Sequence, residues 1–232
     1  MQNKQNQTYS IEELKHIQEQ LVNQVSLQNK FKMEDMKYVG GVDIAYWMEE
    51  GIDYGACCIV VVDYVTKEVV EEVHHVEKIT FPYISGYLAF RELPLVLETV
   101  KKLTIQPDLY MFDGNGYLHT RHMGIATHAS FELGRPTIGV AKTYLKINAV
   151  DFIIPKNQVG AYTDIVINHE VYGRTLRSRK DVKPIFVSCG NWIDLETATK
   201  ITMHFVEKDS RLPITTRLAD LATHEARRMY RK

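Results

Sequence analysis

The sequence predicts an α/β protein whose mixed sheet joins an antiparallel meander of three strands to parallel strands, with helices flanking the sheet. Three strand-like runs separated by short turns predict the meander. Two later apolar runs with a helix-like stretch between them are typical of a parallel crossover. The 232 residues are 45% hydrophobic and 25% charged, which suits one domain over residues 1–232.

Capping and turn residues mark the expected elements of the first half. Ser10 followed by Glu13 is a capping-box pattern that begins a helix. The apolar face of this helix is expected at Ile11, Leu14, Ile17, Leu21 and Val25. Strands are expected over residues 38–46, 56–64 and 68–76, with turns at 51–55 and 65–67. A further helix is expected over 88–103, kinked or restarted at Pro94.

The second half alternates buried strands with helices. A strand over 109–112 ends at Asp113, a helix covers about 121–133, and the next strand covers 136–141. Further strands are expected at 163–167 and 185–188. Asp194 can cap a helix that reaches about residue 205, and residues 213–228 form the last helix.

Composition excludes several classes of protein. The N-terminus has no apolar core behind a basic start, and no run approaches the roughly 18 apolar residues of a membrane span. We therefore expect a soluble, cytoplasmic protein with no membrane partner. Cys57, Cys58 and Cys189 give an odd count without zinc spacing, which argues against a disulfide framework.

The charge pattern leaves nucleic-acid binding to local patches. A net charge of −1 gives no overall attraction to a polyanion. Two basic clusters could supply such patches: Arg174, Arg177, Arg179, Lys180 and Lys183, and then Arg211, Arg217, Arg227, Arg228 and Arg231. Plain solvated surface is the alternative interpretation of both clusters.

The stretch 81–94 joins a stiff aromatic loop to an amphipathic helix. Pro82 fixes its own φ and biases the preceding residue toward an extended backbone, while Ser85-Gly86 can turn the chain or cap a helix. Tyr83 and Ile84 therefore lie on a short projection that could enter a base stack. Packing alone is the alternative explanation for either half of the segment.

Two aspartates stand at unusual places in the expected strands. Asp43 lies mid-strand among apolar and small residues, where an unpaired charge is costly, so it is either a satisfied structural acceptor or a metal ligand. Asp113 ends a buried strand just before Gly114, and ligands favour such strand ends in α/β sheets. A tight Asp-Gly turn is the alternative.

Asp43, Glu92 and Asp113 gain meaning as a set. A first strand, the following helix and a fourth strand can be neighbours around one point. Carboxylates gathered there suit Mg²⁺ or Mn²⁺, which would relieve their repulsion. Two such ions about 4 Å apart can activate water and stabilise the leaving oxygen in phosphodiester cleavage.

Three further residues each have two interpretations. Asp220 is either a fourth carboxylate on the last helix or a surface residue of that helix. Lys142 follows a buried strand and either meets a phosphate or developing charge, or is an exposed strand-end lysine. His119 either positions a phosphate or a water, or is an ordinary loop histidine.

In order along the chain, these residues resemble the endonuclease V family from about Val39 to the last helix. Five ordered motifs carry the resemblance: Gly40-Gly41-Val42-Asp43, Pro82 to Glu92, Asp113 to His119, Gly139 to Lys142, and Leu212 to Ala219. The resemblance implies a ribonuclease H-like fold. It also implies a metal-dependent nuclease of deaminated nucleic acid that recognises inosine and cuts on its 3′ side.

The resemblance also implies residue roles. Asp43 and Asp113 are the principal metal ligands, Glu92 and Asp220 complete the acidic set, and Lys142 assists charge stabilisation; these five are the expected catalytic residues. Contacts to nucleic acid are expected from Pro82, Tyr83, Ile84, Ser85, Gly86, Gly114 and His119. Tyr83 is the wedge inserted where the altered base leaves the stack, a step that costs a few kcal/mol and is easier for a mispaired inosine.

We therefore expect a Mg²⁺-dependent DNA repair endonuclease, with Mn²⁺ as a substitute ion, that acts as a monomer on double-stranded DNA containing deoxyinosine. It should cleave the second phosphodiester bond 3′ to the lesion and leave the lesion on the nicked strand. Ser85 stands where many bacterial members have proline and also occurs in the RNA-preferring eukaryotic branch. An inosine-specific endoribonuclease acting on single-stranded RNA is thus the nearest alternative, and a non-catalytic lesion-binding module is another.

Overall fold

The computed structural model describes residues 10–231; residues 1–9, on which part of the expectation about an export leader rests, and residue 232 lie outside the described residues. The helices are α1 (Ile11–Val22), the short 3₁₀ helix η1 (Met33–Asp35), α2 (Leu88–Val100), α3 (Ile125–Leu133), α4 (Leu195–His204) and α5 (Ile214–Tyr230). The strands are β1 (Tyr38–Glu49), β2 (Ile52–Asp63), β3 (Val69–Lys78), β4 (Leu109–Asp113), β5 (Thr137–Ala141), β6 (Tyr162–Ile167), β7 (Glu170–Leu176) and β8 (Ile185–Asn191). Along residues 10–231 no helix has the length and apolar character needed to cross a membrane.

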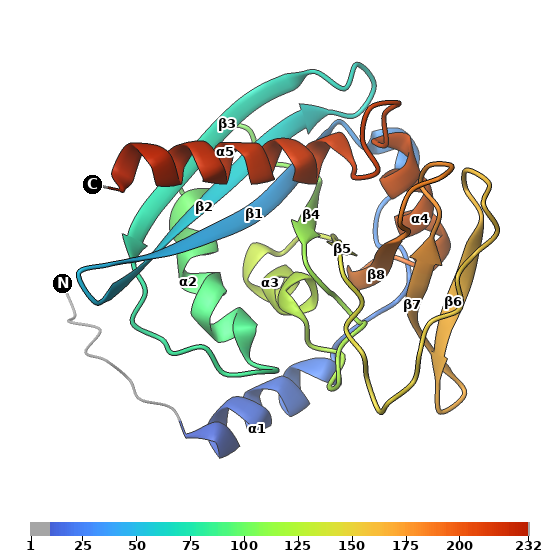
Figure 1. Cartoon of the computed structure of the whole chain (residues 1–232), viewed down its shortest axis with the longest axis horizontal. Coiled ribbons are helices and arrows are strands. Elements are labelled where there is room, and N and C mark those ends of the chain that lie inside the picture. Colours follow the sequence, from blue (N-terminus) through green and yellow to red (C-terminus); the bar gives the residue numbers. More distant parts are fainter. Residues whose placement is uncertain (1–9, 232) are drawn as a thin grey trace.

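These strands form one mixed sheet in the order β3-β2-β1-β4-β5-β8-β7-β6 (Figure 1). β3, β2 and β1 form the antiparallel meander, and β4 and β5 run parallel to β1. β8, β7 and β6 extend the sheet in antiparallel fashion. This order confirms the predicted mixed sheet and its ribonuclease H-like arrangement.

Helices cover both faces of the sheet. One apolar core lies between the sheet and the pair α4 and α5, and a second lies between the sheet and the pair α2 and α3. Along β1, Val39 and Trp47 belong to the first core and Val42 to the second, because successive side chains of a strand point to opposite faces. Figure 1 shows α5 crossing in front of β1 and β2.

A glycine lets α5 approach β1 closely. A Cβ atom on Gly41 would lie 2.1 Å from the backbone oxygen of Thr215, at the start of α5, so no larger side chain fits there. Asp43 follows further along β1, and Asp220 further along α5. The close contact at Gly41 therefore brings these two carboxylates onto the same side of the sheet.

The first hairpin is tighter than the sequence pattern suggests. β1 continues to Glu49 and β2 begins at Ile52, so the turn is Glu50-Gly51 and the expected turn at 51–55 is wrong. Both turn residues have positive φ, 50° and 76°, as a two-residue hairpin of the primed type requires. The longer strands extend the sheet beyond the expected limits.

Helix α1 has the expected capping box but a different buried face. Ser10 and Glu13 exchange the two hydrogen bonds of the box. The buried residues of α1 are Leu14 and Gln18, whereas Ile11 is 53% exposed. A polar side chain therefore occupies the position at which the helix meets the rest of the protein.

Two other helices differ from their expected forms. α2 continues through Pro94 to Val100, so the helix does not restart at the proline. α3 begins at Ile125 and not near residue 121, because His122 has a φ of 53°, which a right-handed helix excludes. Residues 121–124 therefore belong to the loop between β4 and α3.

Strand β7 has no counterpart among the expected elements, because its arginine suggests exposed surface. Arg174 is instead buried and pairs with Asp164 on β6 at 2.8 Å and with Glu196 on α4 at 3.1 Å. Arg177 is also buried and donates to backbone carbonyls, including that of Val182. These two members of the first basic cluster hold the fold together and are not available as exposed surface.

Candidate active site

Three aspartates from separate elements meet beside the sheet. Asp43 lies in β1, Asp113 ends the adjacent parallel strand β4, and Asp220 lies on α5. One carboxylate oxygen from each lies within 4.8 Å of the others. Val42 pairs with Phe112 in the parallel register, so the aspartates that follow these two residues fall at the same level of the sheet. Asp220 thus joins the carboxylates and is not a plain surface residue.

Lys142 joins two of these aspartates. Its Nζ atom lies 2.5 Å from Oδ2 of Asp113 and 2.8 Å from Oδ1 of Asp220. The lysine directly follows β5, in which Val140 pairs with Asp113. Burial lowers the pKa of Lys142, but its bonds to the two aspartates outweigh burial and raise the pKa overall. The side chain therefore supplies a fixed positive charge.

The ionised form of Asp43 is destabilised by its surroundings. Burial, together with the charge of Asp113, raises the pKa of Asp43 to about 7, although Lys142 acts in the opposite direction. Oδ2 of Asp43 accepts a hydrogen bond from the hydroxyl of Thr223 at 3.1 Å. Near neutral pH the carboxyl group is therefore poised between its charged and neutral forms.

Glu92 approaches the aspartates from the other face of the sheet. Asp43 faces α5, whereas Tyr46 lies on the alternate face of β1, toward α2. The Tyr46 hydroxyl donates a hydrogen bond to Oε1 of Glu92 at 2.8 Å. The pKa of Glu92 is raised to about 7, chiefly by burial; the Tyr46 bond opposes this rise and the charge of Asp43 adds to it. Glu92 is thus electrostatically coupled to Asp43 but lies outside the group of three within 4.8 Å.

This arrangement fits a divalent cation that prefers oxygen ligands. Mg²⁺ and Mn²⁺ are held by carboxylates, and the group supplies three. The pKa values of Asp43, Glu92 and Asp113 are all raised, first by burial and then by neighbouring negative charge. A cation at this point would offset both effects. The residues present therefore match the expected metal.

A hollow of about 480 Å³ opens beside Asp113 and Glu92. Of the residues expected to contact nucleic acid, those that line it are Tyr83, Ser85, Gly86, Gly114 and His119. Pro82 and Ile84 are not among its lining residues. The Tyr83 side chain is 71% exposed, so its ring projects into solvent at this site. Through Asp113 the hollow reaches the group of three aspartates.

His119 is a buried, neutral part of this hollow. Burial lowers its pKa to about 4, and the positive charge of Arg121 acts in the same direction. Its Nδ1 atom accepts a hydrogen bond from the backbone N–H of Arg121 at 3.2 Å, which assigns the ring proton to Nε2. His119 is therefore a fixed hydrogen-bonding group and not a positive charge at neutral pH.

Arg91 braces the aromatic loop. Its side chain is buried, donates from Nη1 to the backbone oxygen of Phe81 at 2.5 Å, and pairs with Asp53 on β2 at 3.1 Å. Its guanidinium also lies over the ring of Tyr46, 4.9 Å from the centroid. The adjacent residues Arg91 and Glu92 thus have different roles, since Arg91 holds the loop and Glu92 approaches the aspartates.

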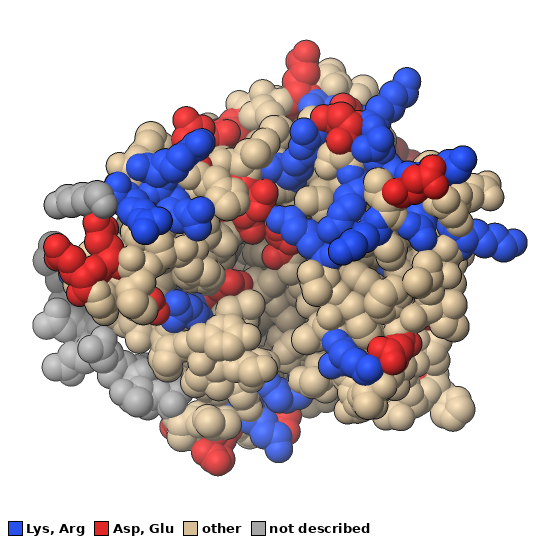
Figure 2. Space-filling view, viewed as in Figure 1, with Lys and Arg blue, Asp and Glu red and all other residues tan. Residues whose placement is uncertain are grey.

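Basic side chains flank the hollowed face of the molecule (Figure 2). One group lies over α4 and the start of α5, and another lies over the C-terminal end of α5. Lys183 and Arg228 are exposed members of the two predicted clusters. Arg217 instead pairs with Asp209, and Arg211 donates to the backbone oxygen of Pro184 at 2.8 Å. Part of each cluster is therefore committed to the fold, and part is available to phosphates.

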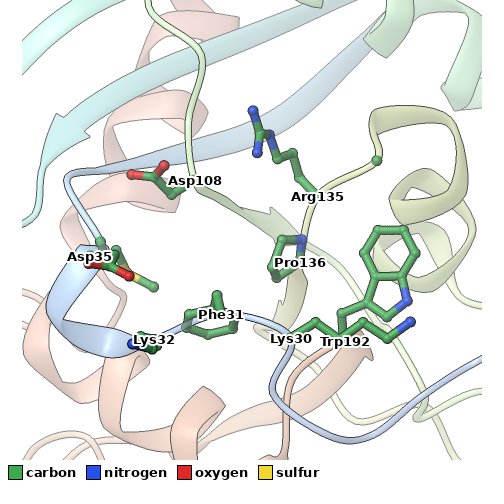
Figure 3. A pocket seen from close by; sticks show the side chains of 10 residues that line it. Lys30, Phe31, Lys32, Asp35, Asp108, Arg135, Pro136 and Trp192 are labelled. Atoms are coloured by element: carbon green, nitrogen blue, oxygen red, sulfur yellow. The ribbon is translucent and has the colours of Figure 1, made fainter.

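A second hollow, of about 320 Å³, contains none of the predicted site residues. In Figure 3 the carboxylates Asp35 and Asp108 lie on one side of it, and Lys30 and Trp192 lie on the other. The ammonium of Lys30 lies 5.0 Å from the centroid of the Trp192 ring. Asp108 is already occupied, because its Oδ2 accepts hydrogen bonds from two backbone N–H groups. The predicted site residues that line a hollow therefore lie at the one beside Asp113 and not at this one.

A family model described as Endonuclease V matches residues 19–221. The chain belongs to the endonuclease V family. The matched range contains all five motifs of the sequence and all of the acidic residues described above. Membership in this family identifies the protein as a nuclease.

Individual members of the endonuclease V family resemble the chain over nearly its whole length. Endonuclease V of Bacillus thuringiensis subsp. konkukian is 63% identical over 218 residues, which cover 94% of this chain and 93% of that protein. The crystal structure of Endonuclease V from Bacillus subtilis has a TM-score of 0.93 at 55% identity and covers 96% of this chain and 94% of that one. Endonuclease V of Ciona intestinalis, crystallised with a 24mer DNA containing an inosine followed by a ribo-adenosine, has a TM-score of 0.83 at 29% identity, with coverages of 94% and 98%.

Four side chains that hold this endonuclease V site were missed by sequence reasoning: Tyr46, Thr223, Arg121 and Gln18. Thr223 follows Asp220 at the i, i+3 spacing of one helix face, and this spacing could have pointed to it. Tyr46 becomes relevant only once Glu92 is known to approach from the other face of β1. Gln18 gave no signal, because a glutamine in an amphipathic helix is expected to face water.

Proposed function

We propose that residues 1–232 form a single catalytic domain of a Mg²⁺-dependent DNA repair endonuclease, with Mn²⁺ as a substitute ion. It would recognise deoxyinosine in double-stranded DNA, cleave the second phosphodiester bond 3′ to the lesion and leave the lesion on the nicked strand. The observation that carries this proposal is the group of Asp43, Asp113 and Asp220 beside a hollow lined by the Tyr83 loop. A cutting site and a base-sized recess are thus adjacent.

The acidic residues divide the chemical work. Asp43, Asp113 and Asp220 would hold the ion, and Glu92 would complete the acidic set from the other face of the sheet. When bound, a divalent cation lowers the pKa of an attacking water and stabilises the charge that develops on the phosphate. Lys142, fixed between Asp113 and Asp220, would stabilise negative charge on the phosphate or the leaving oxygen.

Base recognition would use the loop and the hollow together. The exposed ring of Tyr83 can fill the space that a base leaves in the stack. The displaced base would enter the hollow lined by Ser85, Gly86, Gly114 and His119. Since leaving the stack costs less for a mispaired inosine than for a matched base, part of the selectivity would come from weakness of the duplex itself. Pro82 and Ile84 would stiffen and shape the loop.

RNA containing inosine is the second candidate substrate. Ser85 lines the hollow, and the family resemblance described above associates a serine at this position with RNA-preferring members. The Ciona intestinalis protein was crystallised with a 24mer DNA containing an inosine followed by a ribo-adenosine, so that protein accommodates one ribonucleotide beside the inosine. These observations support single-stranded inosine-containing RNA as an alternative to duplex DNA. In both cases the same carboxylates would perform the hydrolysis.

A nicking assay tests the proposal. End-labelled duplexes with inosine, uracil, an abasic site or a plain mismatch, and a matched inosine-containing RNA, are incubated with the protein with and without Mg²⁺. We expect Mg²⁺-dependent nicking of the inosine duplex, mapped to the second bond 3′ of the lesion. Preferential cutting of the RNA would favour the endoribonuclease. Lesion binding without any metal-dependent product would support the non-catalytic module instead.

A further inference from the structure

Two hydrogen bonds join helix α1 to two loops at the hollow, and a third joins these loops to each other. Nε2 of Gln18 donates to the backbone oxygen of Gly86 at 3.2 Å, and Nη2 of Arg121 donates to the same oxygen at 2.7 Å. Nε of Arg121 in turn donates to Oε1 of Gln18 at 2.5 Å. We call this closed triangle the Gln18 clasp. Figure 1 shows α1 next to the loops that lead into α2 and α3.

Gln18 is suited to this position by its hydrogen bonds and not by its volume. The side chain is fully buried, and only Leu14 is also buried on α1. A buried amide is unfavourable unless its polar atoms are paired, and here both the donor and the acceptor are used. An apolar side chain would fill the same space without this requirement. The buried glutamine therefore points to a need for directed contacts.

The other two members of the clasp are equally constrained. Gly86 has a φ of 81°, and a Cβ atom there would lie 2.8 Å from Nη2 of Arg121, so glycine is required at this turn. The guanidinium of Arg121 also lies over the ring of Tyr87, 4.3 Å from the centroid. The turn before α2 and the loop before α3 thus contact each other directly, and Gln18 bonds to both of them.

The clasp joins two segments that line the hollow. Residues 81–87, here called the wedge loop, contribute Tyr83, Ser85 and Gly86. Residues 114–124, the pocket loop, contribute Gly114 and His119. A site binds a ligand more tightly when its walls are already held in place, because less conformational entropy is lost on binding. A hydrogen-bonded tie between these loops therefore bears directly on binding of a displaced base.

We propose that Gln18 is a positioning residue that fixes the wedge loop against the pocket loop and thereby sets how tightly the protein binds an inosine base. This inference rests on the proposed function. Gln18 lies just outside the range that the family model matches, residues 19–221. The aspartates stand on β1, β4 and α5, whereas the hydrogen bonds of Gln18 go to the two loops. Its loss should therefore weaken base binding more than it slows hydrolysis.

Gln18→Met tests the inference, because methionine keeps the approximate volume and removes both hydrogen bonds. Single-turnover nicking of an inosine duplex at increasing protein concentration gives a maximal rate and a half-saturating concentration. We expect the half-saturating concentration to rise about tenfold, as the loss of a hydrogen bond to a charged group predicts, with the maximal rate within about threefold of wild type. Gln20→Met is the matched control, since Gln20 is an exposed glutamine on the same helix.

A second variant and a second readout keep the test decisive. Gln18→Glu keeps an acceptor for Arg121 but has no hydrogen to donate to Gly86, so we expect it to bind inosine as weakly as Gln18→Met even where its thermal unfolding is normal. Fluorescence of 2-aminopurine placed beside the inosine reports base displacement without cleavage, and both variants should need more protein to reach half of the signal change.

Two results would overturn the proposal. The first is a half-saturating concentration within twofold of the Gln20→Met value in both variants. If Gln18→Met does not fold, the same result for Gln18→Glu alone is sufficient. The other is a fall in maximal rate with no change in half-saturation, which would make Gln18 a general support of the acidic site. A wild-type protein that cuts no inosine strand would refute the proposed function itself, and the two failures are therefore distinguishable.

Discussion

The hydroxyl of Tyr46 donates a hydrogen bond to Oε1 of Glu92 at 2.8 Å and so links β1 to α2 beside the three aspartates. The bond opposes the effect of burial on Glu92, whose pKa is still raised to about 7. Tyr46 therefore favours the ionised form of this buried carboxylate.

Replacing Tyr46 with phenylalanine should shift the pH dependence of nicking. Without the hydrogen bond the pKa of Glu92 rises above 7, so a smaller fraction is ionised at neutral pH. The acid limb of the rate profile should move up by about 0.5–1 pH unit, the shift expected for one hydrogen bond. Rates at pH 9 should match wild type within about twofold. An equal loss of rate at every pH would show that Tyr46 acts in another way.

Asp43→Asn and Asp113→Asn should each reduce Mg²⁺-dependent nicking by about 10³-fold or more, because each removes a proposed metal ligand. Neither change should unfold the protein, since both remove a carboxylate whose pKa is raised by burial. Asp35→Asn, at an exposed aspartate of η1, is the control for loss of one negative charge. Nicking rates and thermal unfolding are measured together. Activity near wild type in either variant would remove that residue from the proposed set.

Mg²⁺ should stabilise the protein more as the pH rises. The folded-state pKa values of Asp43 and Glu92 are raised from 3.8 and 4.5 to about 7, so their contribution to stability is present at low pH and is lost as pH rises through 7. A bound cation favours the charged forms and offsets this loss. Below pH 7 the affinity for Mg²⁺ should fall by about tenfold per pH unit for each proton displaced.

Thermal unfolding from pH 5.5 to 8.5, with and without Mg²⁺, measures this linkage. The Mg²⁺-induced rise in the unfolding midpoint should be small at pH 5.5 and increase through pH 7. In Asp43→Asn the metal-free midpoint at pH 8 should exceed that of wild type by about 2–4 °C, the size expected for roughly 1 kcal/mol in a protein of this length. A Mg²⁺ effect independent of pH would contradict titration of these groups.

Tyr83→Ala should weaken discrimination more than chemistry. The exposed ring makes few contacts in the free protein, so its loss should leave thermal stability unchanged. The ratio of nicking rates on inosine and matched adenine duplexes should fall by about tenfold, which corresponds to the stacking energy of one base on an aromatic ring. Tyr83→Phe keeps the ring and should behave like wild type. An unchanged ratio in Tyr83→Ala would remove the wedge role.

Lys183→Ala should reduce the salt dependence of duplex binding. Lys183 is exposed, and its backbone oxygen accepts a hydrogen bond from Arg211. The positive charge of Arg211 in turn lowers the pKa of Asp113, so Lys183 lies near the acidic site. If Lys183 contacts one phosphate, the slope of log affinity against log salt should become less steep by about 0.9. Lys101→Ala, at the end of α2, serves as the comparison. Equal slopes for the two variants would place the DNA away from Lys183.

Local pattern identified most of the elements but not all of their limits. Ser10 and Asp194 cap their helices as their sequence contexts indicate. The two-residue turn after Glu49 and the late start of α3 depend on positive φ angles at Glu50 and His122. Glutamate and histidine do not indicate a positive φ in the way that glycine does, so neither limit could be predicted. β7 was not predicted, because Arg174 suggests exposed surface. Its burial depends on Asp164 on β6 and Glu196 on α4, which lie in other parts of the chain.

The candidate site shows the same division. Asp43 and Asp113 could be singled out because a carboxylate in or at the end of a buried strand is energetically unusual wherever it occurs. The sequence therefore determined by itself the acidic character of the site, the aromatic loop before α2 and the mixed α/β fold. Asp220 and Glu92 could not be assigned their places in this way, since either residue is also ordinary on a helix surface.

Only the tertiary structure decided which carboxylates share one point and which side chains hold them. α5 meets β1 at Gly41 and brings Asp220 to Asp43, whereas the alternation of β1 sends Tyr46 to Glu92 on the other face. Gln18 and Arg121 meet across more than a hundred residues of chain. Such contacts depend on the distance between elements, and a linear sequence specifies that distance only through the packing of the whole fold.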